Sequence, residues 1–367
     1  MAKGRNAAII LAAGLSSRSP GFKPLLPLGA STILERVISI FPEEDIDVCV
    51  VTGHRSGEIL QSLKTGNLEI VHNPDYQHGM FTSIQAGVRT LKAEHESFFV
   101  MPVDIPLVRR ATVSLLINEA ELSPGKIIYP VFEGRRGHPP LIPASLIPEI
   151  LAWNKDGGLK ALLSGHTDIS IEVAVPDSNI LFDVDTPEDY EELIRRYQRI
   201  HIPTTAETEA ILEINKVSLD IRQHSETVAE VAVKITASLN KSGQKVDVDL
   251  IKAAALLHDV AKGKPEHDAE GRRVLRNMGF SHVGDIVAAH TDLNDDDKTD
   301  FSIETRIIYL ADKFVDGTRL VSIEERYQAS NAKYAVTEEI KANIERRKAR
   351  ALKVQNEFEK MAGVPIP

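Results

Sequence analysis

The stretch AAIILAAGLSSRSPGFKPLL, residues 7–26, indicates the fold of the first half of the chain. Its apolar start is continuous, which is typical of a β-strand buried on both faces of a sheet. The strand leads into small residues whose backbone N–H groups can approach phosphate oxygens. These small residues are Gly14, Ser16 and Ser17. Arg18 and Lys23 follow and can neutralise phosphate charge, but the residues alone leave an ordinary strand and turn as an equal alternative.

Length and composition limit the kinds of protein that this chain can be. It has 367 residues, which predicts two domains, and 43% hydrophobic with 26% charged residues, as in globular proteins. The net charge of -10 argues against a broad nucleic-acid-binding face and leaves local basic pockets open. No run approaches the roughly 20 apolar residues of a membrane span, and the start lacks signal-peptide features. We expect a cytoplasmic protein with Cys49 in its core.

Residues 7–195 alternate β-rich runs with helical stretches. The predicted strands cover residues 7–14, 47–53, 68–73, 97–104 and 127–132. The predicted helices between them cover residues 32–41, 56–64 and 82–94. This alternation is typical of βαβ units, so we expect an α/β domain with a mainly parallel sheet covered by helices on both faces.

Two acidic residues follow β-like runs, at the place where open α/β sheets bind ligands. Asp104 follows FFVMPV and Asp185 follows ILFDV. The segment DTPED also predicts a helix start, with Thr186 as the N-cap, Pro187 in the first turn and Asp189 at the capping-box position. Because Thr186 already fills the cap, the carboxylate of Asp185 stays free. Two carboxylates that reach one point suit Mg²⁺.

Six motifs occur in one order over about residues 6–197: LAAGLSSR with KPLL, NPDYQHGMFTSIQAG, PVDIP, RRGHPPLIP, KDGGLKALL and FDVDTPEDY. On these motifs the chain resembles the MobA-like NTP transferases, and within them the molybdenum cofactor cytidylyltransferase branch. The resemblance implies a Rossmann-like nucleotidyltransferase domain over residues 1–199. Within that family, LAAG rather than LAGG implies a preference for CTP over GTP. Ser19-Pro20 departs from the Met-Gly that usually follows the arginine.

The resemblance also implies roles for particular residues. The nucleotide phosphates would be held by the loop and two cations: Leu11, Ala12, Ala13, Gly14, Ser16, Ser17, Arg18 and Lys23. Asp104 and Asp185 would hold Mg²⁺. The base or acceptor region would be lined by Gly79, Met80 and Ser83, and the acceptor would face His138, Asp156, Gly157 and Gly158.

In the implied reaction, a phosphate oxygen of the acceptor attacks the α-phosphate of the NTP, and pyrophosphate leaves. Such a transfer depends on positioning and charge stabilisation, which Mg²⁺, Arg18 and Lys23 would supply. RRGHPP and KDGGLKALL favour molybdopterin as the acceptor, with a molybdoenzyme receiving the product. A sugar phosphate or another phosphorylated small molecule remains the alternative acceptor.

From about residue 205 the sequence is helical in period, with no alternating strand evident. The predicted helices cover residues 208–221, 225–243, 248–263, 270–279 and 303–320. We interpret residues 200–214 as a linker and the entry to the first helix, residues 215–335 as an all-α domain and residues 336–367 as a charged helical tail. The tail is expected to pack through three apolar residues, Ile340, Ile344 and Leu352.

Histidines and aspartates mark separate helices of this second half. His224 is placed at a helix start, His258-Asp259 at the end of an apolar helix, and His267 at the start of another. His290 ends DIVAAHTD, and Asp312 interrupts the apolar stretch IIYLADKFV. Mixed imidazole and carboxylate ligands suit Mn, Fe, Co, Ni or Zn, without a choice among them. A metal would offset the cost of burying these polar groups.

This half resembles the HD superfamily of metal-dependent phosphohydrolases over about residues 215–330. The resemblance implies a first metal on His224, His258, Asp259 and Asp312, and a second on Asp259, His267 and His290. Lys262, in the HDxxK form, would steady phosphate charge from one helical turn beyond His258. The extra histidines match two-metal members, notably a small bacterial group that hydrolyses diadenosine tetraphosphate. The alternative is a regulatory nucleotide-sensing module without hydrolase activity.

Overall fold

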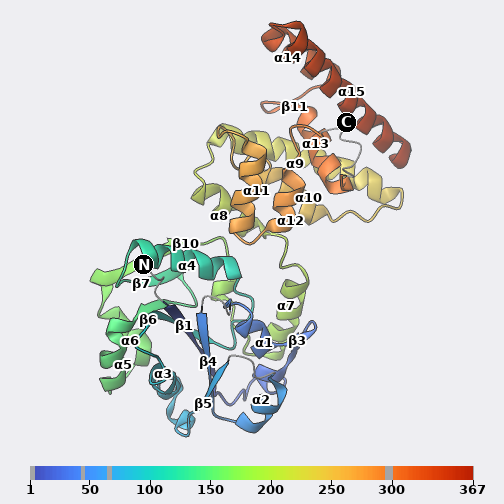
Figure 1. Cartoon of the computed structure of the whole chain (residues 1–367). Coiled ribbons are helices and arrows are strands. Elements are labelled where there is room, and N and C mark those ends of the chain that lie inside the picture. Colours follow the sequence, from blue (N-terminus) through green and yellow to red (C-terminus); the bar gives the residue numbers. More distant parts are fainter. Residues whose placement is uncertain (1–4, 43–45, 64–67, 294–300, 367) are drawn as a thin grey trace. The chain divides into compact units, whose positions relative to one another are not determined.

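The computed structural model describes residues 5–42, 46–63, 68–293 and 301–366 (Figure 1). The chain divides into two compact units, of which the first ends at Ile200 and the second begins at His201. Lys64, the last residue of the predicted helix 56–64, lies outside the described residues, as does Pro367. Within the described part of the chain, no helix has the length and apolar character that crossing a bilayer requires.

The first unit is built on an eight-stranded sheet with the order β10-β7-β9-β6-β1-β4-β5, and β8 pairs with β7. The strands are β1 (Arg5–Ala12), β4 (Ile46–Thr52), β5 (Glu69–His72), β6 (His95–Pro102), β7 (Ile127–Phe132), β8 (Arg135–Arg136), β9 (Leu141–Pro143) and β10 (Ser170–Ala174). β1 pairs in parallel with β4 and β6, β4 with β5, and β7 with β10, whereas β8 and β9 are antiparallel. The predicted mainly parallel sheet is confirmed. A small hairpin joins β2 (Pro27–Leu28) to β3 (Ser31–Thr32).

The helices of this unit are α1 (Ile33–Ile38), α2 (Ser56–Ser62), α3 (Met80–Val88), α4 (Arg110–Leu122), α5 (Ile147–Ala152), α6 (Gly158–Ser164) and α7 (Pro187–Gln198). Short 3₁₀ turns cover Lys23–Leu25, Tyr76–His78, Ala144–Leu146, Thr167–Ile169 and Ser178–Leu181. The prediction of a helix over 82–94 was wrong at both ends, because α3 begins at Met80 and stops at Val88. The backbone N–H of Lys92 donates to Nδ1 of His95 (3.0 Å), which closes a turn where the helix was expected to continue.

Both faces of the central strand are buried, as its continuous apolar sequence predicts. Alternate residues of β1, such as Ile9, pack in one cluster with the buried side chains of α3, α5 and α6. On the opposite face, Phe41 follows α1 and lies against Phe99 of β6, with ring centroids 5.5 Å apart. Gly87 lets α3 approach the sheet closely, because a Cβ there would lie 2.4 Å from the side chain of Ile9. Cys49 is 3% exposed, which confirms it as a core residue.

The strand order creates a crevice at the carboxyl ends of β1 and β6. The chain adds β4 and β5 on one side of β1 and then crosses to β6 on the other side. This reversal is the topological switch point at which open α/β sheets bind ligands. The loop after β1 and the residue Asp104 after β6 therefore belong to the same edge of the sheet.

The segment before Asp185 was wrongly predicted to resemble a strand. Residues Ser178–Leu181 form a 3₁₀ turn, which the side chain of Asp177 caps by accepting a hydrogen bond from the N–H of Asn179 (3.3 Å). Two backbone hydrogen bonds to other segments take the place of a strand ladder. The N–H of His138 donates to the carbonyl of Ile180 (3.0 Å), and the N–H of Val184 donates to the carbonyl of Asp104 (2.9 Å). That bond still brings Asp185 beside Asp104. The predicted capping box of α7 is confirmed between Thr186 and Asp189.

The second unit is helical. Its helices are α8 (Thr205–Ile214), α9 (Leu219–Lys241), α10 (Val248–Leu257), α11 (His267–Asn277), α12 (Ser281–Val287), α13 (Ile303–Lys313), α14 (Ile323–Tyr334) and α15 (Glu338–Ala362). A hairpin of β11 (Val315–Asp316) and β12 (Arg319–Leu320) was missed, because two-residue strands are too short to show alternation. The predicted helix 208–221 is broken after Ile214, where Lys216 adopts a left-handed conformation with φ 53°.

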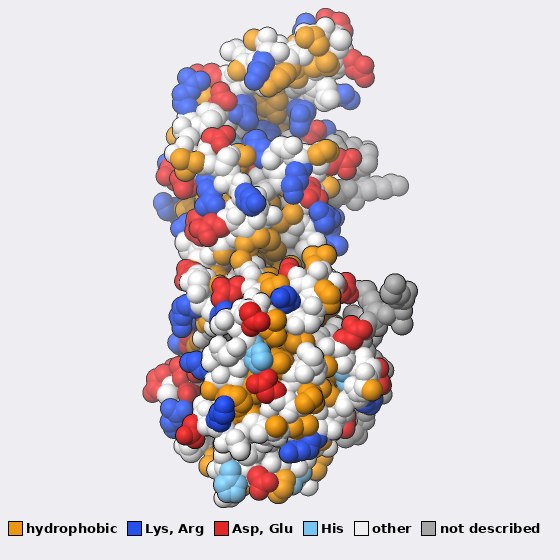
Figure 2. Space-filling view, turned by 90° about the vertical axis from the view of Figure 1, so that its left-hand side faces the viewer, with side chains coloured by type: hydrophobic (Ala, Val, Ile, Leu, Met, Phe, Trp, Pro, Cys, Tyr) orange, Lys and Arg blue, Asp and Glu red, His pale blue; other side chains and the backbone are white. Residues whose placement is uncertain are grey.

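Helical periodicity explains the core of this unit. In α9 a buried stripe repeats every three or four residues: Val228, Val231, Ala232, Ile235 and Leu239. The C-terminal helix α15 joins the same core through Ala351, Val354, Phe358 and Ala362. Ile344 and Leu352 also pack against it, but Ile340 is 38% exposed, so its predicted packing was wrong. On the face shown in Figure 2, acidic and basic side chains are interspersed over this unit.

Candidate functional site

A pocket opens at the carboxyl ends of β1 and β6. Its lining includes residues that the sequence analysis assigned to nucleotide, metal or acceptor binding: Leu11, Ala13, Gly14, Ser16, Lys23, Met80, Ser83 and Asp104. Pro24, Tyr76, Pro102 and Val103 complete the lining and were not predicted. Tyr76 lies inside a quoted motif, NPDYQHG, but its aromatic side chain carried no signal of its own. The fold therefore gathers four separate chain segments at one point.

Lys23, which lines this pocket, contacts both Asp104 of the lining and Asp185, which lies outside the lining. Nζ of Lys23 is 3.5 Å from Oδ2 of Asp104 and 3.0 Å from Oδ1 of Asp185. Nη2 of Arg18 contacts the other oxygen of Asp185 at 2.7 Å. The Lys23 side chain is 9% exposed and that of Arg18 is 74% exposed, so the lysine is built into the site while the arginine lies at its rim. The two carboxylates thus converge on one cation position.

Burial and charge act in opposite directions on Asp104. Removal from water raises the pKa of its carboxyl group above the ordinary value, and the positive charge of Lys23 opposes that rise. A cation at this position therefore stabilises the ionised carboxylate.

The loop after β1 is tied to the same lysine. Ser16 has a left-handed backbone, with φ 53°, and its Oγ accepts a hydrogen bond from the N–H of Lys23 (3.1 Å). The N–H of Ser19 donates to the carbonyl of Ser16 (3.2 Å), so the Ser19-Pro20 variation lies in a turn that closes on Ser16. A Cβ on Gly14 would meet no described atom within 4 Å, which leaves the backbone open to the pocket.

Other predicted residues of this unit lie outside the pocket lining. Ala12 is fully buried within β1. Ser17, Gly79 and Asp156 are exposed. Gly157 begins the turn into α6, and a Cβ on its neighbour Gly158 would lie 3.5 Å from the side chain of Phe81 in α3. The predicted acceptor turn therefore lies against the helix that carries Met80 and Ser83.

His138 is a partly buried histidine of the predicted acceptor region. Burial lowers the pKa of its imidazole, and the negative charge of Asp104 acts in the opposite direction. Its Nδ1 is buried and has no hydrogen-bond partner among the residues that the structure describes. A buried nitrogen in this state is available to a ligand atom.

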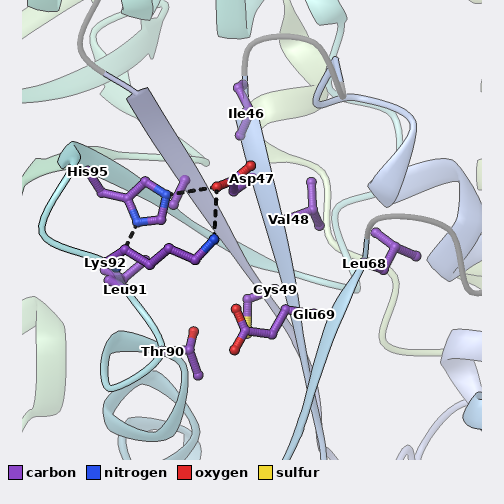
Figure 3. Close-up of a pocket in the computed structure, with 11 residues that line it drawn as sticks. Ile46, Asp47, Val48, Cys49, Leu68, Glu69, Thr90, Leu91, Lys92 and His95 are labelled. Atoms are coloured by element: carbon purple, nitrogen blue, oxygen red, sulfur yellow. Dashed lines mark hydrogen bonds and ion pairs between the residues drawn. The ribbon is translucent and has the colours of Figure 1, made fainter.

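A second pocket lies at the opposite, amino ends of the same strands (Figure 3). Nε2 of His95 is 3.1 Å from Oδ2 of Asp47, and Nζ of Lys92 is 3.7 Å from the same oxygen. Because Nδ1 of His95 accepts the N–H of Lys92, Nε2 carries the proton and donates it to Asp47. These polar groups satisfy one another, and the lining contains none of the predicted site residues.

In the second unit, the predicted ligands of the first metal come together. Nε2 of His224 lies 3.2 Å from Oδ1 of Asp312, and Nε2 of His258 lies 3.4 Å from Oδ2 of Asp259. One ligand atom from each of His224, His258 and Asp259 lies within 4.8 Å of the others. All four residues are buried.

The predicted ligands of the second metal share Asp259 with the first. One ligand atom from each of Asp259, His267 and His290 lies within 4.8 Å of the others. Oδ1 of Asp259 is 3.3 Å from Nε2 of His290 and 3.8 Å from Nε2 of His267. Asp259 therefore presents one oxygen to each group of histidines.

Backbone carbonyls fix the orientation of three imidazoles. Nδ1 of His224, His258 and His290 lies 2.7–2.8 Å from the carbonyl oxygens of Gly317, Ala255 and Val287, respectively. A carbonyl only accepts, so each Nδ1 carries a proton and each Nε2 can offer its lone pair to the cluster. Nε2 of His258 is buried without a hydrogen-bond partner in the described part of the chain. This donor set fits a metal ion.

Neighbouring charged groups lower the pKa values of the two buried acids of this cluster, Asp259 and Asp312. Burial alone would raise the pKa of Asp259, but its contacts with His258 and His290 outweigh burial and hold the pKa below the ordinary range. For Asp312, burial acts in the same way, and Lys313 with His224 outweighs it, so its pKa is also lowered. Both carboxylates are therefore ionised at neutral pH, as metal ligands must be.

Helix boundaries change two predictions about this cluster. α10 ends at Leu257, so Lys262 lies in a turn beyond the helix, and the argument that it shares a helix face with His258 was wrong. The turn instead brings Nζ of Lys262 into contact with Oδ2 of Asp259. His224 is the sixth residue of α9 rather than its first.

Several neighbours of the cluster were missed from the sequence. Nζ of Lys313 donates to Oδ2 of Asp312 (2.7 Å) and to the carbonyl of His290 (3.0 Å). From α15, Nη2 of Arg347 donates to the carbonyl of Thr291 (2.8 Å). Arg347 and Arg350 also contact the carboxylate of Asp292. The C-terminal helix therefore holds Thr291 and Asp292, the two residues after His290.

Comparisons with known proteins agree with this division of the chain. The sequence profile of the MobA-like NTP transferase domain matches residues 8–169. The molybdenum cofactor cytidylyltransferase of Escherichia coli (strain K12) is 34% identical over 195 residues, which cover 52% of this chain and 97% of that protein. The chain belongs to the MobA-like NTP transferase family. The HD domain profile matches residues 221–315, so this MobA-type nucleotidyltransferase is joined to an HD domain.

Solved structures similar to the MobA-like domain include two microbial proteins. The crystal structure of Rv0371c from Mycobacterium tuberculosis H37Rv covers 52% of this chain and 98% of its own, with 21% identity and a TM-score of 0.46. A nucleotidyl transferase from Methanothermobacter covers 53% of this chain and 99% of its own, with 23% identity and a TM-score of 0.46.

Proposed function

We propose that the MobA-like domain transfers a cytidylyl group from CTP to molybdopterin and releases pyrophosphate. The observation that carries this proposal is the convergence of Asp104 and Asp185 on Nζ of Lys23, beside a pocket at the switch point of the sheet. The 34% identity to a molybdenum cofactor cytidylyltransferase supports the choice of acceptor.

The residues of this site have distinct tasks in the proposed transfer. Lys23 and Arg18 bind phosphate oxygens. The open backbone at Gly14 lets these phosphate oxygens approach the loop closely. Asp104 and Asp185 would hold Mg²⁺, because their hard oxygen atoms already converge on a cation. When bound, the ion supplies neutralisation of phosphate charge. His138 and the Asp156–Gly158 turn would position the acceptor.

The experiment is pyrophosphate release by the purified chain with molybdopterin and each NTP in turn. We expect CTP to be used fastest. Activity with GTP equal to or greater than that with CTP would contradict the cytidylyl assignment. Faster transfer to a sugar phosphate than to molybdopterin would favour the alternative acceptor.

We further propose that the HD domain is a metal-dependent phosphohydrolase acting on a small nucleotide. The proposal rests on the imidazole Nε2 atoms that face one acidic cluster, among which Nε2 of His258 has no hydrogen-bond partner in the described part of the chain. The first ion would be held by His224, His258, Asp259 and Asp312, and the second by Asp259, His267 and His290. The ions supply a Lewis acid and a water of lowered pKa. Lys262, half-exposed beside Asp259, can neutralise substrate phosphate.

The test loads the chelator-stripped chain with Mn²⁺ or Fe²⁺ and offers dinucleoside polyphosphates, NTPs and cyclic nucleotides. We expect hydrolysis of at least one class, and His258→Ala should abolish it while cytidylyl transfer persists. Nucleotide binding without hydrolysis by the loaded chain would favour the regulatory-module alternative.

A further inference from the structure

Two carboxylates of the HD domain make matching contacts with the two groups of histidines. Oδ1 of Asp312 lies 3.2 Å from Nε2 of His224, which belongs to the first group of ligands. Oδ1 of Asp268 lies 3.1 Å from Nε2 of His267, which belongs to the second group. Each group therefore has a carboxylate oxygen next to one of its imidazole nitrogens. Asp312 was predicted as a ligand from the sequence and Asp268 was not.

The second oxygen of each carboxylate is held by a neighbouring donor. Oδ2 of Asp312 accepts a hydrogen bond from Nζ of Lys313 (2.7 Å), the next residue in the chain. Oδ2 of Asp268 accepts one from Oγ1 of Thr291, the residue after His290. In both cases one oxygen anchors the carboxylate and the other oxygen is turned towards the histidines.

The inward oxygen of Asp268 lacks a hydrogen bond. Oδ1 is buried and accepts none from any residue that the structure describes, although His267 Nε2 is at ion-pair distance. Nδ1 of His290 is also near, at 3.6 Å, but it already donates to the carbonyl of Val287. A buried carboxylate oxygen without a donor is costly unless a cation compensates it.

The position of His267 indicates where that cation belongs. Its Nε2 is close to two carboxylate oxygens, 3.1 Å from Oδ1 of Asp268 and 3.8 Å from Oδ1 of Asp259. Separations of about 3 Å are those of neighbouring ligand atoms around an ion with bonds near 2.1 Å. An ion bound by His267 and Asp259 is thus within reach of Asp268.

We propose that Asp268 is a fourth protein ligand of the second metal ion. Each ion is then bound by two imidazoles, by Asp259, which both ions share, and by one carboxylate that binds that ion alone. This carboxylate is Asp312 at the first ion and Asp268 at the second. The inference rests on the proposed metal-dependent function of the HD domain. Two carboxylates per ion favour Mn²⁺ or Fe²⁺. With four protein ligands, the second ion is expected to stay bound when no substrate is present.

The experiment measures metal binding rather than turnover. The full chain is stripped with a chelator and dialysed against a series of Mn²⁺ concentrations, and bound metal is counted by mass spectrometry. All chains in this experiment carry Asp104→Asn and Asp185→Asn, so that the ion proposed for the MobA-like domain does not add to the count, and this background is called wild type here. We expect two ions per wild-type chain. Asp268→Asn should bind the first ion unchanged and the second ion on the order of 10- to 100-fold more weakly, because the amide keeps an acceptor for Thr291 but loses the anionic ligand.

Two variants separate ligation from other effects. Glu270→Gln makes the same charge change on the same helix, at a carboxylate paired with Lys264 and Arg273, and should retain both ions. Thr291→Val removes the anchoring hydrogen bond but leaves the carboxylate, so we expect a smaller loss of affinity than in Asp268→Asn.

The outcomes distinguish this inference from the function on which it rests. A wild-type chain that binds no ion would overturn the proposed hydrolase itself. Two ions of unchanged affinity in Asp268→Asn, or a single ion in the wild type, would overturn only the assignment of Asp268. A loss in Thr291→Val equal to that in Asp268→Asn would also overturn it, because Asp268 would then act by orienting its neighbours.

Discussion

The two units of this chain hold their clustered acids in different ways. In the MobA-like domain, Asp104 and Asp185 converge on the ammonium group of Lys23, so the chain supplies its own cation. In the HD domain, Lys262 and Lys313 contact Oδ2 of Asp259 and of Asp312, respectively, and Oδ1 of each acid faces an imidazole nitrogen. The first arrangement is complete until a charged substrate arrives. The second leaves Nε2 of His258 and Oδ1 of Asp268 without a hydrogen-bond partner among the described residues, and the proposed metal ions would satisfy both atoms.

The largest effect should come from the acid that both groups of histidines share. Asp259→Asn removes a ligand from each proposed ion, so hydrolysis should fall by about 10³-fold or more. Nucleotidyl transfer should be unchanged, because the mutation lies in the other unit. Parallel assays of both activities check this, with Asp249→Asn, an exposed acid on α10, as the matched control. Retained hydrolysis would show that the cluster is not catalytic.

The corresponding change in the MobA-like domain tests the site in which Asp104 and Asp185 contact Lys23. Asp104→Asn should lower transfer by about 100- to 1,000-fold, because one of two carboxylates near the proposed Mg²⁺ is lost. The fold should persist, since burial already raises the pKa of this group and disfavours its charge. Turnover and thermal unfolding are measured together, with the exposed Asp168→Asn as the control. Near-normal turnover would refute the metal assignment.

Metal removal should affect the stability of the HD domain. An ion present at 100 times its dissociation constant stabilises the folded state by about 2.7 kcal/mol, and chelation removes that contribution. Thermal unfolding with Mn²⁺ and with a chelator should therefore differ in the wild type. The difference should disappear in Asp259→Asn, and a shift of equal size in that variant would place the ion elsewhere.

The smallest effect is expected at the phosphate loop. Gly14→Ala should leave thermal stability unchanged, because the added Cβ meets no described atom within 4 Å. It should raise the KM for CTP several-fold, because the added methyl group occupies part of the pocket. Gly53→Ala is the structural counterpart. Its Cβ would lie 2.7 Å from Tyr76 and 2.9 Å from Ala13, so it should destabilise the unit by about 1–3 kcal/mol. An unchanged KM in Gly14→Ala would exclude close approach of the nucleotide.

Features that depend on neighbouring residues could be predicted from the sequence. The continuous apolar run of β1 and the capping box at Thr186 and Asp189 arise from contacts within a few positions. The order of histidines and aspartates was sufficient to propose the metal cluster, and motif order was sufficient to identify both families. The failures were also local in origin, since periodicity alone did not reveal that α10 stops before His258.

Contacts between distant segments were decided by the tertiary structure. Asp185 reaches Lys23 across 162 positions, because Val184 bonds to the backbone after β6 rather than joining the sheet as a strand. Asp268 meets Thr291, and Lys313 meets the carbonyl of His290, each across 23 positions. The sequence by itself determined which groups could ligate, from residue type and helical or strand period. Only packing of the two cores decided which of them share a site, since that depends on how whole elements fit together.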